Sequence, residues 1–315
     1  MDEFSEVFDV VEARGQVTGA FAARGRWVAR SFSRTPLKLA VMVRGRARLS
    51  ADGLEAPVYL EEGDVAILNG RSWLELEGGT GDGPVREIEP EITDLTTGVL
   101  STDPDCDLVV GGRVLLNRAG EDLLLQALPP VGHVRAEAAE ATRLRVIVAQ
   151  LVDEVSAARM GSGFAIRQYA QLLVLEVLRA YVGQAQLPPG RLRVLTDTRL
   201  RPAVSRMHAE PGRAWKLAEL AHAAAMSRTS FAERFRAVAG VPPLTYLNGW
   251  RMLLAQRALG ERDVRVGTIA ADLGYTSESA FSTAFKREVG ESPLRYRARI
   301  REQQSVTMAI PASAN

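Results

Sequence analysis

The chain has 315 residues, of which 46% are hydrophobic, and its mean hydropathy is −0.04; these values suit a soluble protein of two domains. No apolar run approaches the roughly 20 residues of a membrane span, and the acidic start Met1-Asp2-Glu3-Phe4 is unlike a signal peptide. The single cysteine, Cys106, excludes an internal disulfide framework. We therefore expect a cytoplasmic protein without a membrane partner.

Charge is distributed unevenly, although the net value is only +1. Residues 197–302 contain 18 Lys and Arg against 11 Asp and Glu, a net charge of +7, whereas residues 1–196 have a net charge of −6. A basic second half indicates contact with a polyanion. The alternative is ordinary charge variation between two domains.

Residues 20–116 have the pattern of a β-domain. Within residues 37–44, Leu37, Leu39 and Val41 recur with the period of two that is typical of a strand. Further short apolar runs follow, separated by turns such as Gly63-Asp64 and Asn69-Gly70. Many short strands at close spacing predict a small barrel or sandwich.

Two segments after residue 121 have helical spacing, 136–160 and 164–182. One face of the second carries Ile166, Tyr169, Leu173 and Val177. Such a pair beside a barrel predicts a lid or a dimer seam, and plain packing within the chain is the alternative. The sequence Pro188-Pro189-Gly190 predicts a linker over residues 186–196. Residues 304–315, uncharged and rich in Ser and Ala, predict a disordered tail.

The C-terminal part repeats itself at an offset of 50 residues. The matched pairs are Ser227 and Ser277, Phe231 and Phe281, Phe235 and Phe285, Arg236 and Lys286, Gly240 and Gly290, Pro243 and Pro293, and Tyr246 and Tyr296. So many matches at one offset indicate a duplicated supersecondary unit.

Each copy has the pattern of a helix, a short turn and a second helix. In the first copy, helices are predicted over 215–223 and from the N-cap Ser227 to about Val238. In the second, they are predicted over 266–273 and, after the N-cap Ser277, over 278–289. Both copies therefore predict a helix-turn-helix.

Residues 244–259 predict one continuous helix between the two copies. A rigid spacer would place the two recognition helices in successive major grooves of double-stranded DNA, about 34 Å apart. A purely structural helical bundle is the alternative, but two copies in a basic segment favour DNA binding.

Specific motifs recur in a fixed order over residues 215–297. They are Trp215-Lys216-Leu217-Ala218-Glu219-Leu220-Ala221, Met226-Ser227-Arg228, Phe231 to Arg236, Gly240-Val241-Pro242-Pro243, Leu273-Gly274-Tyr275 and Phe285-Lys286-Arg287. This set resembles the AraC/XylS family of bacterial transcription regulators. The resemblance implies an activator of transcription that has RNA polymerase as a partner and forms a homodimer.

The resemblance also implies which side chains contact DNA. Base contacts would come from Arg228, Thr229, Ala232 and Glu233 of the first recognition helix and from Glu278, Ser279 and Thr283 of the second. Phosphate contacts would come from Ser227, Arg236, Ser277 and Lys286. Most of the base-facing side chains are short or acidic: Glu233 and Glu278 can accept from cytosine N4, and Ala232 offers only a methyl contact to thymine.

The front domain resembles the cupin-like sensory domain found in one branch of this family. The resemblance rests on the Gly63-Asp64 turn, the run from Leu128 to Val134 and the helical segment that follows. Of the three histidines, only His133 lies in this domain, and Trp73 stands where relatives often carry a histidine. We therefore expect no metal, no cofactor and no cupin catalysis, so that the protein is not an enzyme.

A small-molecule effector is the remaining role for this domain. Trp27 and Trp73 are candidate pocket walls, Arg44 or Arg46 could pair with an anionic ligand, and His133 is a further candidate. For each of them, ordinary core packing, a solvated strand face or, at His133, a structural hydrogen bond is the alternative. A redox role for Cys106 is disfavoured, because the flanking Asp105 and Asp107 oppose a thiolate.

Together these features predict an α+β chain: a cupin-like β-barrel with following helices, then an all-α domain with two helix-turn-helix units. The expected boundaries are 1–135 for the sensory domain, 136–185 for its helices, 186–196 for the linker, 197–303 for the DNA-binding domain and 304–315 for the tail. The expected function is effector-controlled transcription regulation. The alternatives are a constitutive DNA-binding protein whose front domain only dimerises, and a cupin enzyme with a DNA anchor, which the missing histidines disfavour.

Overall fold

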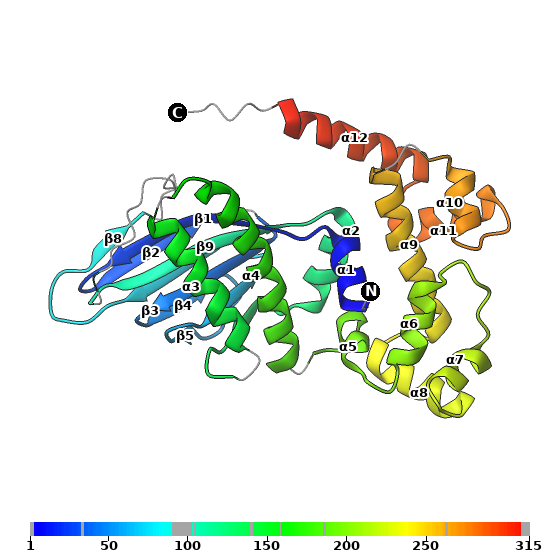
Figure 1. The fold of residues 1–315 in the computed structure, drawn as a ribbon, viewed down its shortest axis with the longest axis horizontal. Helices are drawn as coiled ribbons and strands as arrows, with labels where there is room; N and C mark the ends of the chain where they lie inside the picture. Colours follow the sequence, from blue (N-terminus) through cyan, green and yellow to red (C-terminus); the bar gives the residue numbers. More distant parts are fainter. Residues whose placement is uncertain are drawn as a thin grey trace. The chain divides into compact units, whose positions relative to one another are not determined.

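The computed structural model describes residues 3–32, 35–89, 103, 105–138, 141–157, 159–184, 187–261 and 264–309. The chain divides into two compact units (Figure 1). Val11–Gln186 form the β-unit, and Met1–Val10 together with Leu187–Asn315 form the helical unit. The predicted α+β class, with a β-rich first part and a helical second part, is confirmed.

Two five-stranded sheets build the β-unit. The first has the order β1 (Arg14–Ala23), β9 (Asp107–Leu115), β3 (Leu37–Arg44), β6 (Val65–Asn69) and β10 (Val131–Val134). The second has the order β5 (Val58–Leu60), β4 (Ala47–Ala51), β7 (Trp73–Gly78), β2 (Trp27–Phe32) and β8 (Arg86–Ile88). All neighbouring strands pair antiparallel except β2 and β8, which are parallel.

Strand β3 is buried on both faces, which explains why its sequence alternates weakly. Ala40 and Met42 belong to the core shared with Trp27, whereas Leu39 and Val41 face helix α4 (Ser162–Gln184). Lys38 is buried too, and its Nζ donates to the carbonyl of Arg71 at 2.8 Å. Burial lowers the pKa of Lys38, and the negative charge of Asp52 opposes that shift only in part.

Helix α4 packs against the backbone of β1 (Figure 1). A β-carbon on Gly15 would collide with the carbonyl of Ala170, so the glycine permits this close approach. The side chain of Gln171 accepts from the amide of Gly15 and donates to the carbonyl of Ala13. The predicted helices therefore pack within the β-unit, and α3 (Thr142–Ala157) begins six residues later than expected. Between β9 and β10 lie the short helix α2 (Arg118–Gly120) and the π-helix η2 (Glu121–Leu125).

Nine helices are described in the helical unit. They are α1 (Glu3–Val11), α5 (Arg191–Thr196), α6 (Arg201–Ala209), α7 (Leu217–Ala223), α8 (Arg228–Ala239), α9 (Pro243–Glu261), α10 (Val266–Asp272), α11 (Glu278–Val289) and α12 (Pro293–Ala309). Helix α9 is the predicted continuous spacer. Within the ranges that the structure describes, no helix is long and apolar enough to cross a membrane.

Three predicted boundaries differ from the structure. The linker predicted over 186–196 contains helix α5, because Leu192 and Val194 are buried in the helical unit. The tail predicted over 304–315 is helical as far as Ala309, since no Gly or Pro interrupts α12 before Pro311; residues 310–315 lie outside the described part. The first ten residues were expected in the sensory domain but cluster with the helical unit.

His208 of α6 is a buried polar centre of the helical unit. Its ring stacks on Trp250 at 4.0 Å between centroids, its Nε2 lies 3.0 Å from the hydroxyl of Tyr246, and its Nδ1 lies 3.2 Å from a carboxylate oxygen of Glu6. Burial, assisted by the positive charge of Arg191, lowers the pKa of His208 to about 3. The imidazole is therefore neutral in the folded protein at neutral pH.

This shift predicts acid-dependent stability. Between pH 6.5 and about 3, the unfolded chain binds a proton on His208 that the folded chain excludes, so stability falls as the pH falls. His208→Gln, which cannot titrate there, should flatten the pH dependence of the free energy of unfolding by up to about 1.4 kcal/mol per pH unit. Urea unfolding of both proteins at pH 7.5, 6 and 5 measures this, and parallel pH dependences would contradict the assignment.

Candidate nucleic-acid interface

The first helix-turn-helix consists of α7, a turn and α8. Ser227 caps α8: its Oγ accepts from the amide of Ser230 at 3.1 Å. Gly240 ends the helix in the left-handed conformation, with φ of 74°. In the turn, Ala225 also has a positive φ, 51°, and the amide of Met226 bonds the carbonyl of Ala221. The predicted cap and end of this helix are confirmed.

The second helix-turn-helix, α10 with α11, repeats these devices. Ser277 Oγ accepts from the amide of Ala280 at 3.1 Å, and Gly290 ends α11 with φ of 91°. Gly274 provides the turn with φ of 78°. The observed bounds of α11 are the predicted ones, because the cap, the apolar spacing and the terminal glycine agree.

An aromatic row anchors each recognition helix. In the first unit, Phe231 and Phe235 lie 5.6 Å apart and Phe235 meets Tyr246 edge-on at 5.4 Å. In the second unit, the corresponding distances are 5.7 Å between Phe281 and Phe285 and 5.6 Å between Phe285 and Tyr296. All four phenylalanines are fully buried. The 50-residue repeat is thus a repeat of packing geometry as well as of sequence.

The opposite sides of both recognition helices face solvent. On α8 the side chains of Arg228, Thr229, Glu233 and Arg236 are exposed, and Ala232 is half-buried. On α11 the exposed side chains are those of Glu278, Ser279, Thr283 and Lys286. The helices thus bring each set of predicted DNA-contacting residues together on one capped element. Their individual contacts with DNA stay predictions.

Some of these polar groups already have partners in the protein. Ser227 Oγ also donates to Ser230 Oγ at 3.0 Å, and Thr283 Oγ1 donates to the carbonyl of Ser279 at 3.0 Å. The Glu278 carboxylate lies against Gly267, where a β-carbon would come within 2.9 Å of Oε2. To donate to DNA, the hydroxyls of Ser227 and Thr283 must turn their protons away from these partners, whereas their remaining lone pairs can accept without such a change.

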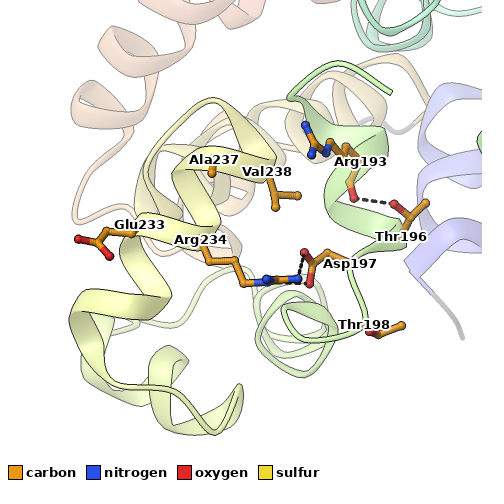
Figure 2. Close-up of a pocket in the computed structure, with 8 residues that line it drawn as sticks. All are labelled: Arg193, Thr196, Asp197, Thr198, Glu233, Arg234, Ala237 and Val238. Atoms are coloured by element: carbon orange, nitrogen blue, oxygen red, sulfur yellow. Dashed lines mark hydrogen bonds and ion pairs between the residues drawn. The ribbon is translucent and has the colours of Figure 1, made fainter. Parts of the chain in front are cut away.

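A groove flanks the first recognition helix, and the sequence did not predict it. It has a volume of about 640 Å³ and lies between α5 and α8. Arg234 and Asp197 pair across it at 2.8 Å, whereas Glu233 points away from that pair (Figure 2). Arg234 is therefore engaged within the protein, although it is adjacent to Glu233 in sequence. Its counterpart at the 50-residue offset is Ala284, and this difference is the sequence signal that could have marked it.

The candidate pocket residues of the β-unit do not come together. Trp27 and Trp73 pair with Gly78 and Phe32 at opposite ends of the β2–β7 ladder, roughly 17 Å apart at 3.3–3.4 Å per residue. Trp27 is a core residue, and its Nε1 donates to Asp107 at 2.6 Å. Arg44 lies at the end of β3.

His133 has a structural partner. Its Nε2 lies 2.7 Å from Oδ2 of buried Asp64. Burial opposes ionisation of Asp64, but hydrogen bonds from His133 and from the amides of Ala136 and Glu61 outweigh this and lower its pKa. Among the residues that the structure describes, no group of three His, Cys, Asp or Glu side chains is arranged to hold a metal.

Two capped helix-turn-helix units in a basic helical unit, preceded by a β-sandwich, define a DNA-binding regulator of transcription. Comparison with known proteins agrees. Residues 2–183 match the Cupin family, and residues 220–299 match a helix-turn-helix domain family. The DNA-binding domain of AdpA, solved in complex with a target DNA, is 35% identical over 34% of this chain and 96% of that chain, with a TM-score of 0.32.

Full-length relatives define the family. A putative AraC-like transcription regulator of Streptomyces lividans is 32% identical over 94% of this chain and 98% of its own length. Another from Streptomyces antibioticus is 33% identical over the same shares of the two chains. The activator RclR of Escherichia coli is 34% identical over 68% of this chain and 71% of its own. The chain belongs to the AraC family of DNA-binding transcription regulators with a cupin-like N-terminal domain.

Arg236 gives a direct prediction for phosphate binding. In the full-length chain, Arg236→Gln should weaken binding to all DNA sequences alike and reduce the slope of log K against log salt by about 0.9, because one counterion fewer is released. Fluorescence anisotropy at several salt concentrations measures this. Arg206→Gln, which removes an exposed charge from α6, is the matched control and should leave the slope unchanged. Equal slopes for wild type and Arg236→Gln would contradict a phosphate contact.

Proposed function

We propose that this chain is a transcription activator that reads an asymmetric DNA site with both helix-turn-helix units and responds to a small-molecule effector bound by the β-unit. The carrying observation is that α8 and α11 have equivalent caps, aromatic anchors and exposed outer faces. Because α8 and α11 are capped and packed in the same way, both units retain an intact recognition helix. Activation, with RNA polymerase as a partner in the cytoplasm, is supported by the relative that is named a transcriptional activator.

Sequence reading is proposed for the exposed faces described above. Arg228, Thr229, Ala232 and Glu233 would meet base edges in one major groove, and Glu278, Ser279 and Thr283 would meet them in the next. Ser227, Arg236, Ser277 and Lys286 would hold the phosphates. The acidic readers favour cytosine, whose N4 is a donor, and disfavour positions that present only acceptors.

Homodimerisation through the helices of the β-unit is part of the proposal. Helices α3 and α4 pack on each other, and their outer surfaces carry the apolar side chains of Val146, Phe164 and Leu172, which are 53%, 64% and 42% exposed. Apolar residues on a helix pair that is already packed on its other side favour contact with a second copy.

The proposal also includes control by a small-molecule effector. One observation favours the alternative, a regulator that binds DNA constitutively. The space between the two sheets is filled by Trp27, Met42, Leu49 and several alanines, and the cavity beside α4 holds about 10 Å³, room for one water at most. This packing favours a constitutive regulator whose β-unit only dimerises. An effector can act only through its different affinity for two states of the protein. Effector control therefore requires a second, more open state of the β-unit.

Selection of bound sequences from a random DNA pool by the full-length chain tests the DNA-binding proposal. We expect enrichment of one asymmetric site with two half-sites a helical turn apart. Enrichment of a single half-site, or of none, would overturn it. A library of small metabolites is then screened for compounds that change the affinity for the selected site. A compound that shifts it supports effector control, and unchanged affinity throughout the library supports the constitutive regulator.

Glu233 provides a residue-level prediction. Glu233→Gln should change the preferred base at one position of the selected site, by about 1–3 kcal/mol of discrimination, because an amide can donate where a carboxylate cannot. Repeating the random-pool selection with the variant measures this. Glu288→Gln, an exposed change near the end of α11, is the control and should select the wild-type sequence. An unchanged preference for Glu233→Gln would remove Glu233 from the base-reading set.

A further inference from the structure

The loop that leads into the first helix-turn-helix unit touches the second unit directly, in addition to the connection through α9. The loop between α6 and α7 carries Gly212, and the turn between α10 and α11 carries Gly274. A β-carbon on Gly212 would lie well under 3.0 Å from the carbonyl oxygen of Asp272, and one on Gly274 would collide with the carbonyl of Gly212. The two backbones therefore meet with no side chain between them.

Arg251 of α9 spans the same contact. Its Nε donates to the carbonyl of Pro211 at 2.6 Å, and its Nη2 donates to the carbonyl of Arg213 at 3.0 Å. Both acceptors belong to the loop that leads into α7, the first helix of the first unit. The guanidinium carbon lies 5.9 Å from the centre of the Tyr275 ring, in the turn of the second unit. One side chain thus contacts both units at once.

The planar guanidinium suits this position. It offers two donors in a fixed fork, which match two carbonyls of one loop, and a flat face that packs over a ring. Burial lowers the pKa of Arg251, and Tyr275 opposes that shift only in part. The side chain therefore gives up hydration for these contacts, which are directional.

The contact continues to both recognition helices. Tyr275 packs edge-on against Phe281 of α11, with centroids 5.4 Å apart. On the other side, the guanidinium of Arg213 lies 4.0 Å from the centre of the Trp215 ring, and Trp215 is buried in the core that holds Phe231. A change at the contact would be transmitted to the anchors of α8 and α11.

Helix α9 packs into the cores of both units, but a helix can still bend along its length, and a second contact between its two ends restricts that bending. The freedom matters on DNA, because one added base pair changes the half-site separation by about 3.4 Å and the rotation between half-sites by about 35°. We propose that Arg251, Gly212 and Gly274 lock the two helix-turn-helix units together and so fix the half-site spacing that the protein accepts. The proposal rests on the proposed function, since it requires both helices on DNA.

The test compares binding to the selected site with binding to the same site carrying one base pair inserted between the half-sites. For wild type, the insertion should raise the Kd by at least roughly 30-fold, which is the typical cost of losing the contacts to a single base pair. For Arg251→Met, which removes both donors to the loop and also the one from Nη1 to Asn248, the insertion should raise it by less than roughly 5-fold. Arg206→Met is the matched control for loss of a positive charge and should keep the wild-type ratio. Arg251→Lys keeps the charge without the fork and should give an intermediate ratio.

The ratio of the two Kd values separates locking from simple stabilisation. If Arg251 only stabilised the fold, its substitution would lower the melting temperature and leave this ratio unchanged. A folded Arg251→Met with the wild-type ratio would therefore overturn the proposal. If Arg251→Met does not fold, Arg251→Lys decides by the same criterion. Failure of the proposed function is recognised separately, because wild type alone would then select no site with two half-sites.

Discussion

The helical unit depends on the burial of four phenylalanine rings. They are Phe231 and Phe235, one helical turn apart on α8, and their counterparts Phe281 and Phe285 on α11. Each is fully buried, and truncation of such a side chain typically costs about 3–5 kcal/mol, a large part of the stability of a small domain. Because one face of each recognition helix is committed to these rings, the other face is oriented toward solvent. The orientation of the DNA-facing side chains is thus a consequence of core packing.

The helical unit was largely predictable where local and tertiary signals agree. In α11, the cap Ser277, the phenylalanine spacing and the terminal Gly290 all mark the same element, and its bounds were predicted correctly. Helix α5 has only six residues and no capping side chain, and isolated helices of that length are unstable in water. Helix α5 is stabilised only when Leu192 and Val194 are buried against the rest of the helical unit. Tertiary contacts of this kind leave no periodic trace in the sequence.

The candidate sites differ in the same way. The predicted DNA-facing residues share two helices, so helical spacing alone puts them side by side on each element. The candidate pocket residues come from different strands, and no sequence period fixes how strands pair. Trp27 and Trp73 consequently proved to be at opposite ends of one ladder, with Trp27 in the core. The contact of Gly212 with Gly274 joins residues 62 positions apart and was equally invisible.

The two helix-turn-helix units share their caps and aromatic cores, so a difference at matched positions indicates a role that only one unit has. Position 234 is an arginine paired with Asp197 of the preceding segment, whereas position 284 is an alanine with no charge to pair. The first recognition helix is thus tied by an ion pair to the segment leading from the linker, and the second is not. A carboxylate with little exposure gives such a pair more strength than a fully solvated one, and Asp197 is mostly buried. A signal arriving through residues 187–197 would therefore reach α8 directly through the Asp197–Arg234 pair. The same segment also contains Arg191, which lies over the ring of Tyr246 in α9 and interacts electrostatically with Glu288 of α11, so α11 is linked to it through Arg191.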